Sequence, residues 1–363
     1  MKNILYSGKL RYSSGICLIC LCMLLSCIAI SLAQAGSPHP GSYQDDVLRA
    51  GAAKTIISPP QGSIMGNSYG TDICKGIHDD LHARALVFEK SGVKAAFIAL
   101  DLVSIPHVVV VETRKLINQH TGIPVNNIIM TATHAHAGPQ MNPLFWKAVG
   151  GVPMQKSREY LKDLPELIAA SVVKAVSRLK PVTVSAGTVK ESSINFNRRF
   201  LMKDGSFRMN PGRLNPNVVR SAGPVDQDVS VVYLESTDLK PVALLVNFAL
   251  HPAIVTGDRI SADFPAVVSD LLAKVMGEEM ITVYTNGTSG NINHVDVNWR
   301  KQPDGFSESA RIGTIIAADV LKALSTLHRI DVNDLRVNSR VVELPVPSVK
   351  AGDIEWARNV INR

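Results

Sequence analysis

A buried strand, a helix and a second strand follow one another between residues 93 and 132. The first strand is the almost wholly apolar run at 93–102, and the second is the apolar run at 127–132. Apolar residues at helical spacing predict a helix over 108–120, which ends before Gly122. A helix that crosses between two such strands makes them parallel, which is typical of an α/β fold.

The remainder of the chain continues this alternation. Further strands are predicted over 182–189, 229–234, 242–250, 281–285 and 335–345, and further helices over 164–179, 264–275 and 305–326. Pro165 is expected in the first turn of its helix. With 363 residues, 46% of them hydrophobic, the chain can form one large domain or two modest ones. The sequence therefore predicts an α/β fold with a mixed, largely parallel sheet that is flanked by helices.

The N-terminus is organised like a secretory signal peptide. An apolar stretch at 16–32 follows three basic residues and precedes Ala33-Gln34-Ala35, which suits a signal peptidase. We therefore expect a signal peptide over 1–35, a flexible lead-in over 36–47 and a folded domain over 48–363. An uncleaved anchor and a lipoprotein site at Cys27 are the alternatives. The expected location is secreted, periplasmic or at the cell surface.

Removing residues 1–35 changes both the cysteine content and the charge. Four of the five cysteines lie in this segment, so only Cys74 remains and no internal disulfide can form. The formal net charge falls by three, from +7 to +4, because the segment carries Lys2, Lys9 and Arg11 and no acidic residue. A mildly basic chain without a run of lysine and arginine gives no support for nucleic-acid binding.

Polar residues follow several of the predicted strands. Asp101 follows the first, His134 and His136 follow the second, and His251 follows the strand at 242–250. Another polar segment, 286–294, is rich in glycine and asparagine and follows the strand at 281–285. Ligands of open α/β sheets bind beyond the carboxyl ends of the parallel strands. We therefore expect the functional site at the C-terminal ends of the strands.

The three histidines suggest a metal site. Residues two apart in an extended segment project to the same side, so His134 and His136 can face one space, and His251 supplies a third imidazole. Zinc bound by such ligands activates water for attack on an amide or ester carbonyl. The alternative is that these are surface or hydrogen-bonded core histidines. The glycine-rich segment fits an oxyanion-binding backbone or an ordinary loop, and Arg198 with Arg199 fits an anion contact or a solvated surface.

Several of these segments resemble one family. The segment 133–139, THAHAGP, is similar to the T-H-T-H-S-G-P motif of neutral, non-lysosomal ceramidases. The segment 247–252, NFALHP, resembles their F-A-[VI]-H-[PG] motif, and 195–198, NFNR, resembles their I-N-R-S motif. The resemblance covers about residues 48–345 and identifies this part as similar to the N-terminal catalytic domain of the neutral/alkaline ceramidases.

The resemblance implies a chemistry and a set of roles. The family hydrolyses the amide of N-acylsphingosine with a zinc-activated water. By resemblance, His134 and His251 are zinc ligands, His136 is an acid/base or supporting histidine, and Arg198 places the substrate or polarises the transition state.

The sequence departs from the family pattern at two points. Where the family carries a serine in its G-D-V-S-P-N segment, this chain has Asn293, which cannot be acylated but can hydrogen-bond a substrate or an oxyanion. The family's remaining zinc ligands, a glutamate and a tyrosine, lie farther toward the C-terminus than residue 363. We therefore expect the catalytic domain over 48–363 to be incomplete at its C-terminus.

The predicted function is a zinc-dependent amidohydrolase that acts on ceramide or a related N-acyl lipid. Its partners would be that lipid and a membrane surface, with no nucleic acid, and the sequence does not predict an oligomeric state. The alternatives are a non-catalytic remnant or binding protein, and a zinc amidase or esterase with a small soluble substrate.

Overall fold

The strand–helix–strand unit at 93–132 is present as predicted. It consists of β4 (Val93–Leu100), α2 (His107–Thr121) and β5 (Ile128–Ala132), and β5 runs parallel to β4. The helix ends at Gly122, whose φ of 72° is a left-handed conformation that glycine adopts without strain. The crossover therefore forms where its local signals place it.

The computed structural model describes residues 47–66, 72–301, 303–346 and 348–361. The predicted signal peptide and all of the lead-in except Val47 lie outside the described residues. Residues from Leu48 onward make one unit. Among the described residues, no helix is both long enough and apolar enough to cross a membrane.

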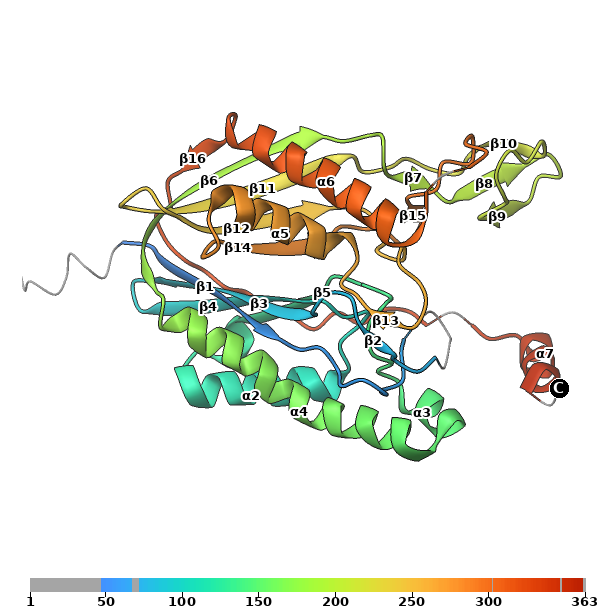
Figure 1. The fold of residues 1–363 in the computed structure, drawn as a ribbon, viewed down its shortest axis with the longest axis horizontal. Coiled ribbons are helices and arrows are strands. Elements are labelled where there is room, and N and C mark those ends of the chain that lie inside the picture. The colour runs from blue at the N-terminus through green and yellow to red at the C-terminus, as the bar shows by residue number, and fades with distance from the viewer. Residues whose placement is uncertain (1–46, 67–71, 302, 347, 362–363) are drawn as a thin grey trace, which may run out of the picture. The chain divides into compact units, whose positions relative to one another are not determined.

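Two layers of one nine-stranded sheet face each other (Figure 1). The first layer contains β1 (Arg49–Ile56), β3 (His82–Lys90), β4 and β5. The second contains β6 (Lys180–Lys190), β11 (Asp228–Ser236), β12 (Pro241–Phe248) and β14 (Ile281–Asn286), and the short β16 (His328–Ile330) pairs with β6. The layers join where Arg49 and Ala50 of the first pair with Pro181 and Lys180 of the second. Small and β-branched residues fill the space between the layers, among them Ala52, Ala99, Val184 and Val283.

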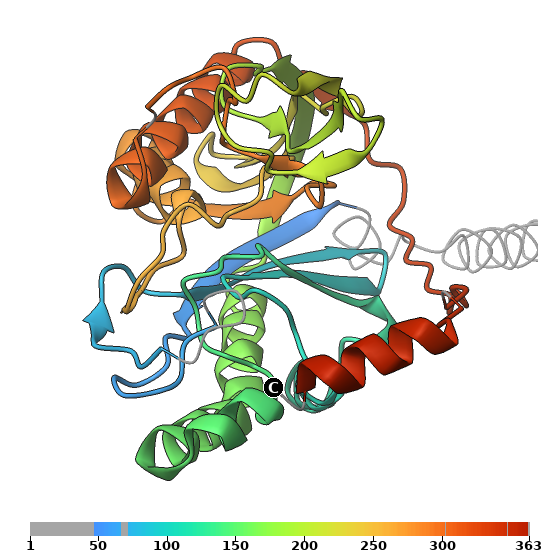
Figure 2. The same ribbon diagram turned by 90° about the vertical axis from the view of Figure 1, so that its right-hand side faces the viewer.

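Helices cover the outer face of each layer (Figure 2). The first layer packs against α2 and α4 (Gly151–Val176), and the second packs against α5 (Phe264–Met276) and α6 (Gly305–Leu324). We call each layer with its two helices a half of the molecule. The short α3 (Pro143–Val149) precedes α4. The result is a four-layer arrangement with an apolar core under each pair of helices and a third between the sheets.

The mixed α/β class with flanking helices is confirmed, but the expectation that the sheet is largely parallel needs correction. Only β4 with β5 and β12 with β14 are parallel, and the other pairs in the two layers are antiparallel. The parallel pairs are those joined by a crossover helix, α2 or α5. A tight turn at Ser91 and Gly92 joins β3 to β4, which makes that pair a hairpin.

Two predicted elements also differ from the structure. The helix predicted from residue 164 begins at Gly151, so Pro165 lies in its interior rather than in its first turn. The strand predicted over 335–345 has no regular structure, and its apolar residues Val341, Val342 and Leu344 are exposed, Val341 at 96%. An alternating pattern forms a strand only when a neighbouring strand completes the hydrogen bonds.

A small three-stranded sheet projects from the connection between β6 and β11. It contains β8 (Arg199–Met202), β9 (Phe207–Met209) and β10 (Val218–Ser221), and we call residues 199–221 the finger. At its base, β7 (Phe196–Asn197) pairs with β15 (Ile292–Asn293). Elsewhere β2 (Gly76–Ile77) pairs with β13 (Arg259–Ile260), and α7 (Ala351–Ile361) lies near the C-terminus.

Candidate metal centre

Three imidazoles from the two halves meet beyond the carboxyl ends of the strands. His134 and His136 follow β5 in the first half, and His251 follows β12 in the second. The Nε2 atom of His136 lies 3.4 Å from that of His134 and 3.1 Å from that of His251. Among the described residues, these three side chains form a cluster that could hold a metal ion, because their ligand atoms all lie within 4.8 Å of one another. The predicted convergence of these three residues is therefore present in the structure.

The hydrogen bonds of the rings separate two of the histidines from the third. Nδ1 of His134 lies 2.7 Å from the carbonyl oxygen of Val103, and Nδ1 of His251 lies 3.3 Å from that of Ser289. A carbonyl only accepts, so each Nδ1 carries a proton, and in the neutral ring Nε2 is the nitrogen with the lone pair. In contrast, Nδ1 of His136 is buried and has no hydrogen-bond partner within the part of the chain that the structure describes.

This difference tests which rings suit a metal. Metal-binding histidines almost always donate their other ring N–H to a carbonyl or carboxylate, as His134 and His251 do. A metal on Nε2 of His136 would move the proton to Nδ1 and leave a buried N–H without an acceptor. The donor set therefore fits a metal held by His134 and His251, with His136 beside it.

The backbone brings the first two histidines together in a different way from the predicted strand alternation. His134 has a φ of 71°, so the chain turns at this residue instead of continuing the strand. The turn is held because the His134 amide donates to the Leu102 carbonyl at 2.9 Å. The His136 amide donates to the Pro252 carbonyl at 3.0 Å, which ties the first half to the segment that carries His251.

Burial keeps two of the rings neutral. It lowers the pKa of His136 to about 4, with smaller contributions from His134 and Arg198. Burial likewise lowers the pKa of His251 to about 4, and the positive charge of Arg198 adds to the effect. Both rings are therefore neutral near pH 7, which is the state that binds a metal.

Arg198 is held by the same loop that holds His251. Its guanidinium donates from Nε and Nη2 to the Gly290 carbonyl, at 3.2 and 2.7 Å, and its backbone amide donates to Asn291 at 2.8 Å. Burial lowers the pKa of Arg198, but an arginine remains charged at any physiological pH. Its charge lies close enough to affect the pKa of His136 and His251.

Asn293 lies with Arg198 at a hollow of about 300 Å³. Its Nδ2 donates to Oδ1 of Asn210 at 3.2 Å, and its Oδ1 accepts from the Val295 amide at 3.1 Å. The apolar part of the wall is formed by Phe200, Val295 and Val297. The structure thus places Arg198 and Asn293 at one hollow, next to the loop that orients His251.

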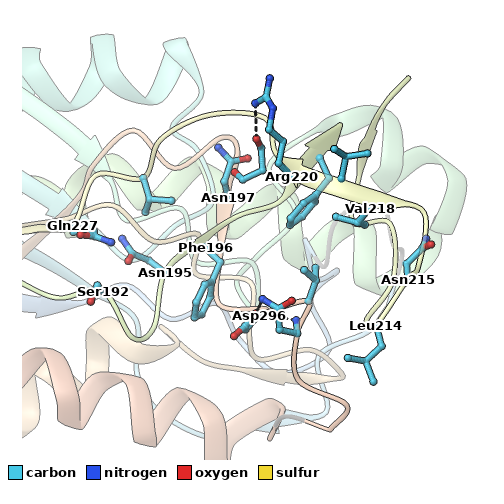
Figure 3. Close-up of a pocket in the computed structure, with 16 residues that line it drawn as sticks. Ser192, Asn195, Phe196, Asn197, Leu214, Asn215, Val218, Arg220, Gln227 and Asp296 are labelled. Atoms are coloured by element: carbon cyan, nitrogen blue, oxygen red, sulfur yellow. Dashed lines mark hydrogen bonds between the residues drawn. The ribbon is translucent and has the colours of Figure 1, made fainter. Parts of the chain in front are cut away.

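A larger cavity of about 470 Å³ adjoins this hollow and shares Phe200 and Val297 with it (Figure 3). It lies at the base of the finger, where Asn195, Phe196 and Asp296 are part of its lining. None of the residues predicted for the site lines it. Three residues of the NFNR segment at 195–198 line it, but the segment gave no local signal of a cavity, because the other walls come from parts of the chain that are far apart in sequence.

Sequence analysis missed the buried ion pair that supports the first half of the site. Arg84 donates to the carboxylate of Asp101, and the His82 amide donates to the same carboxylate at 2.9 Å. Asp101 follows β4 directly, two residues before the carbonyl of Val103 that orients His134. The available signal was an arginine inside the apolar run of β3, where an unpaired charge would be costly.

The fold and the site define a four-layer α/β protein whose strand ends carry a histidine cluster that could hold a metal ion. Residues 52–288 match the family described as neutral/alkaline non-lysosomal ceramidase, N-terminal, and the chain belongs to this family. The resemblance read from the sequence motifs is therefore confirmed.

Known relatives agree with this assignment. The chain is 25% identical to the neutral ceramidase of Pseudomonas aeruginosa over 243 residues, which are 64% of this chain and 34% of that protein. The crystal structure of neutral ceramidase from Pseudomonas aeruginosa superposes with a TM-score of 0.62 at 20% identity, over 77% of this chain and 45% of that chain. A ceramidase complexed with C2 gives 0.63 at 20% identity, over 77% and 44%. The chain thus spans less than half the length of these relatives.

Proposed function

We propose that this protein is a zinc-dependent amidohydrolase that cleaves the amide bond of N-acylsphingosine or a related N-acyl lipid. The observation that carries the proposal is the pair of imidazoles from opposite halves, His134 and His251. Their Nε2 lone pairs meet while carbonyl groups hold their Nδ1 protons. Family membership and a relative complexed with C2 support the choice of an N-acyl lipid.

His134 and His251 would hold the zinc ion. Zinc bound there supplies Lewis acidity, which activates water and polarises an amide carbonyl. The rings are suited to this because they are partly buried, and His251 is neutral near pH 7. Their orientation is fixed by Val103 and Ser289 before any ligand arrives.

The other predicted residues act on the substrate. His136 is neutral, and its Nε2 faces the two ligand nitrogens, so this atom exchanges a proton with water or with the departing amine. Arg198 is positively charged, and it would stabilise the negative charge that the oxygen of the substrate's amide carbonyl gains in the transition state. Asn293 offers an amide for a hydrogen bond to the polar part of the lipid, and Phe200 with Val297 contacts its apolar part.

Metal analysis of the purified protein tests the metal part of the proposal. The wild type is expected to hold zinc, and His134→Ala and His251→Ala are expected to lose it and to lower hydrolysis by at least about 100-fold, more than loss of a supporting contact. His120→Ala is the matched control, because this histidine lies exposed on α2 and contacts Glu166 at 3.9 Å. A wild type that binds no zinc would favour the non-catalytic remnant.

Substrate comparison tests the lipid part. N-acylsphingosine and short N-acyl amides are offered to the same preparation, and the lipid is expected to have the higher kcat/KM. The hollow of about 300 Å³ beside Arg198 has an apolar wall that a short soluble amide would leave uncovered. Hydrolysis of the short amides alone would instead favour an amidase with a small soluble substrate.

The finger suits contact with a membrane surface. Residues 199–221 contain Arg199, Lys203, Arg208, Arg213 and Arg220 against the single acidic residue Asp204. They also expose apolar side chains, including Phe207 and Leu214. Basic residues beside exposed apolar ones favour the surface of an anionic bilayer. Sedimentation with anionic vesicles should exceed that with zwitterionic vesicles, and Phe207→Ser with Arg208→Ser should reduce binding to the anionic vesicles.

An exported location is also part of the proposal and rests on residues 1–35. A basic start, an apolar stretch and Ala33-Gln34-Ala35 support removal of this segment during export. N-terminal sequencing of the protein from its native cells should start at Gly36. A chain that retains Met1 in the membrane fraction would indicate an anchor instead.

A further inference from the structure

The amide side chain of Asn286 joins the two halves beside the histidines. This residue ends β14, and its Nδ2 donates to the Thr133 carbonyl at 3.3 Å and to Oγ of Ser289 at 3.0 Å. Its Oδ1 accepts from the Leu250 amide at 3.3 Å. One side chain therefore uses both ends of its amide to hold three separate segments.

The three partners of Asn286 lie next to the proposed zinc ligands or orient one of them. Thr133 directly precedes His134, and Leu250 directly precedes His251. Ser289 carries the carbonyl that receives the Nδ1 proton of His251. Asn286 thus forms a hydrogen bond to the residue before each proposed zinc ligand, Thr133 in the first half and Leu250 in the second. It also bonds to Ser289, which orients His251.

The backbone next to Asn286 is fixed against the end of β12, so the direction of the Asn286 side chain is fixed as well. The Gly287 amide donates to the Phe248 carbonyl at 3.0 Å. A Cβ atom at Gly287 would lie 3.1 Å from Cα of Ala249, so the exit of β14 rests directly on the exit of β12. A glycine allows this approach without displacing Ala249, and the contact fixes the point from which the Asn286 side chain extends.

We propose that Asn286 is a positioning residue that sets the separation of His134 and His251, an inference that rests on the proposed function. A metal site binds tightly when its ligands already stand at the required distance, and loss of a supporting contact commonly weakens binding by 10- to 100-fold. Only a side chain with a donor and an acceptor at its tip can hold a carbonyl and an amide together, and asparagine provides both.

The substitution Asn286→Asp isolates this role because it keeps the shape and removes the donor. An aspartate would place an oxygen against the Thr133 carbonyl oxygen, so the tie to the first half would be lost. The matched control is Asn247→Asp. Asn247 lies in β12, and its Nδ2 donates to the carbonyl and Oγ1 of Thr285, at 3.3 and 2.9 Å, within the second half alone.

Zinc affinity, measured by competition with a chromogenic chelator, is the first readout. Asn286→Asp is expected to raise the Kd for zinc by about 10-fold or more, and Asn247→Asp by less than about 2-fold. The visible spectrum of bound Co²⁺ is the second readout, because it reports coordination geometry. The spectrum should change in Asn286→Asp and not in Asn247→Asp, even if both variants lower the melting temperature.

Ser289→Ala serves as a milder second variant if Asn286→Asp does not fold. It removes one of the three bonds of the amide, and the expected rise in the zinc Kd is about 2- to 3-fold. Equal zinc affinities in Asn286→Asp and Asn247→Asp, or an unchanged affinity in Ser289→Ala, would overturn the positioning role. A wild type that binds neither zinc nor Co²⁺ would instead overturn the proposed function.

Discussion

The two halves of the molecule share one plan and contribute differently to the site. Each half has three antiparallel strands, a crossover helix, a fourth strand parallel to the third, and a long helix. In the first half the histidines follow the fourth strand, β5, whereas in the second His251 follows the third strand, β12. The fourth strand of the second half, β14, ends instead in Asn286 and the glycine-rich loop.

This comparison separates the elements that build the fold from the segments that build the candidate site. The strands and helices are equivalent in the two halves, so they explain the layers and the cores but not the chemistry. The segments that leave the strands differ, and they carry the imidazoles, Arg198 and Asn286. The first half supplies a turn with two histidines, and the second supplies one histidine together with the contacts that orient it.

The largest predicted difference between the halves concerns their buried ion pairs. In the first half, the side chains of Arg84 and Asp101 are 4% and 1% exposed, whereas in the second half Arg311 is 34% exposed beside a fully buried Glu308. Arg84→Met should lower the free energy of unfolding by about 3–5 kcal/mol, because it leaves a buried carboxylate without its cation. Arg311→Met should cost less, about 1–2 kcal/mol, because Arg311 is itself partly exposed and water already screens its charge, so less attraction to Glu308 is lost.

Urea unfolding monitored by circular dichroism measures both changes. Arg208→Met in the finger is the control, since Arg208 and Asp204 form an exposed pair that should contribute less than about 0.5 kcal/mol. Equal losses in Arg84→Met and Arg311→Met would show that the depth of the ion pair does not distinguish the halves.

The second prediction compares the ends of the two crossover helices. Gly122 ends α2 with φ 72° and ψ 3°, and Gly277 ends α5 with φ 115° and ψ 138°. No atom lies within 4 Å of a Cβ built at either position, so only backbone strain matters. Gly122→Ala should cost about 1 kcal/mol, and Gly277→Ala about 2–3 kcal/mol, because only glycine adopts the second conformation readily. Thermal melting of both variants checks this order, and the reverse order would contradict it.

The smallest predicted effect concerns acid stability, with one histidine in each half. Burial lowers the pKa of His82 to about 4, with the charge of Arg84 adding to this, and burial also lowers the pKa of His294. The unfolded rings titrate near pH 6.5, so the unfolded state binds more protons below that pH, and stability falls as the pH drops below about 6.5, in the case of His82 down to about 4.

Replacing His82 or His294 by asparagine should therefore reduce the loss of stability between pH 7 and pH 5. We expect about 1 kcal/mol or less per residue, because solvent still reaches part of each ring. Urea unfolding at both pH values provides the measurement, and His328→Asn is the control because that ring is exposed. An unchanged difference between the two pH values in His82→Asn would rule out its contribution.

The parts of the fold that were predictable are those with strong local signals. The crossover at 93–132 and helix α5 are bounded by residues such as Gly122 and Gly277, which act within one turn of the chain. The pairing of β1 with β6 and the direction of most strands depend on contacts between distant residues, which a local pattern does not contain. Pro165 predicted the start of a helix, but α4 has 26 residues and begins at Gly151. Packing against the first layer stabilises the helix on both sides of the proline.

The candidate site was predictable in its residues but not in its construction. The histidines and Arg198 follow strand ends in recognisable motifs, and the structure brings them together. Asn286 had only the signal of a turn, Asn-Gly, because its three partners lie 3, 36 and 153 residues away. Whether each residue has the predicted role in zinc binding or catalysis stays a prediction.

At position 134 the residue that the backbone conformation favours differs from the residue that a metal site would need. A residue with a Cβ atom is strained at a φ of 71°, whereas glycine is not. His134→Gly should therefore relieve strain while it deletes an imidazole from the candidate metal centre. A stability-guided redesign of this protein would select that change first, and it would obtain a more robust scaffold without one of the two proposed zinc ligands.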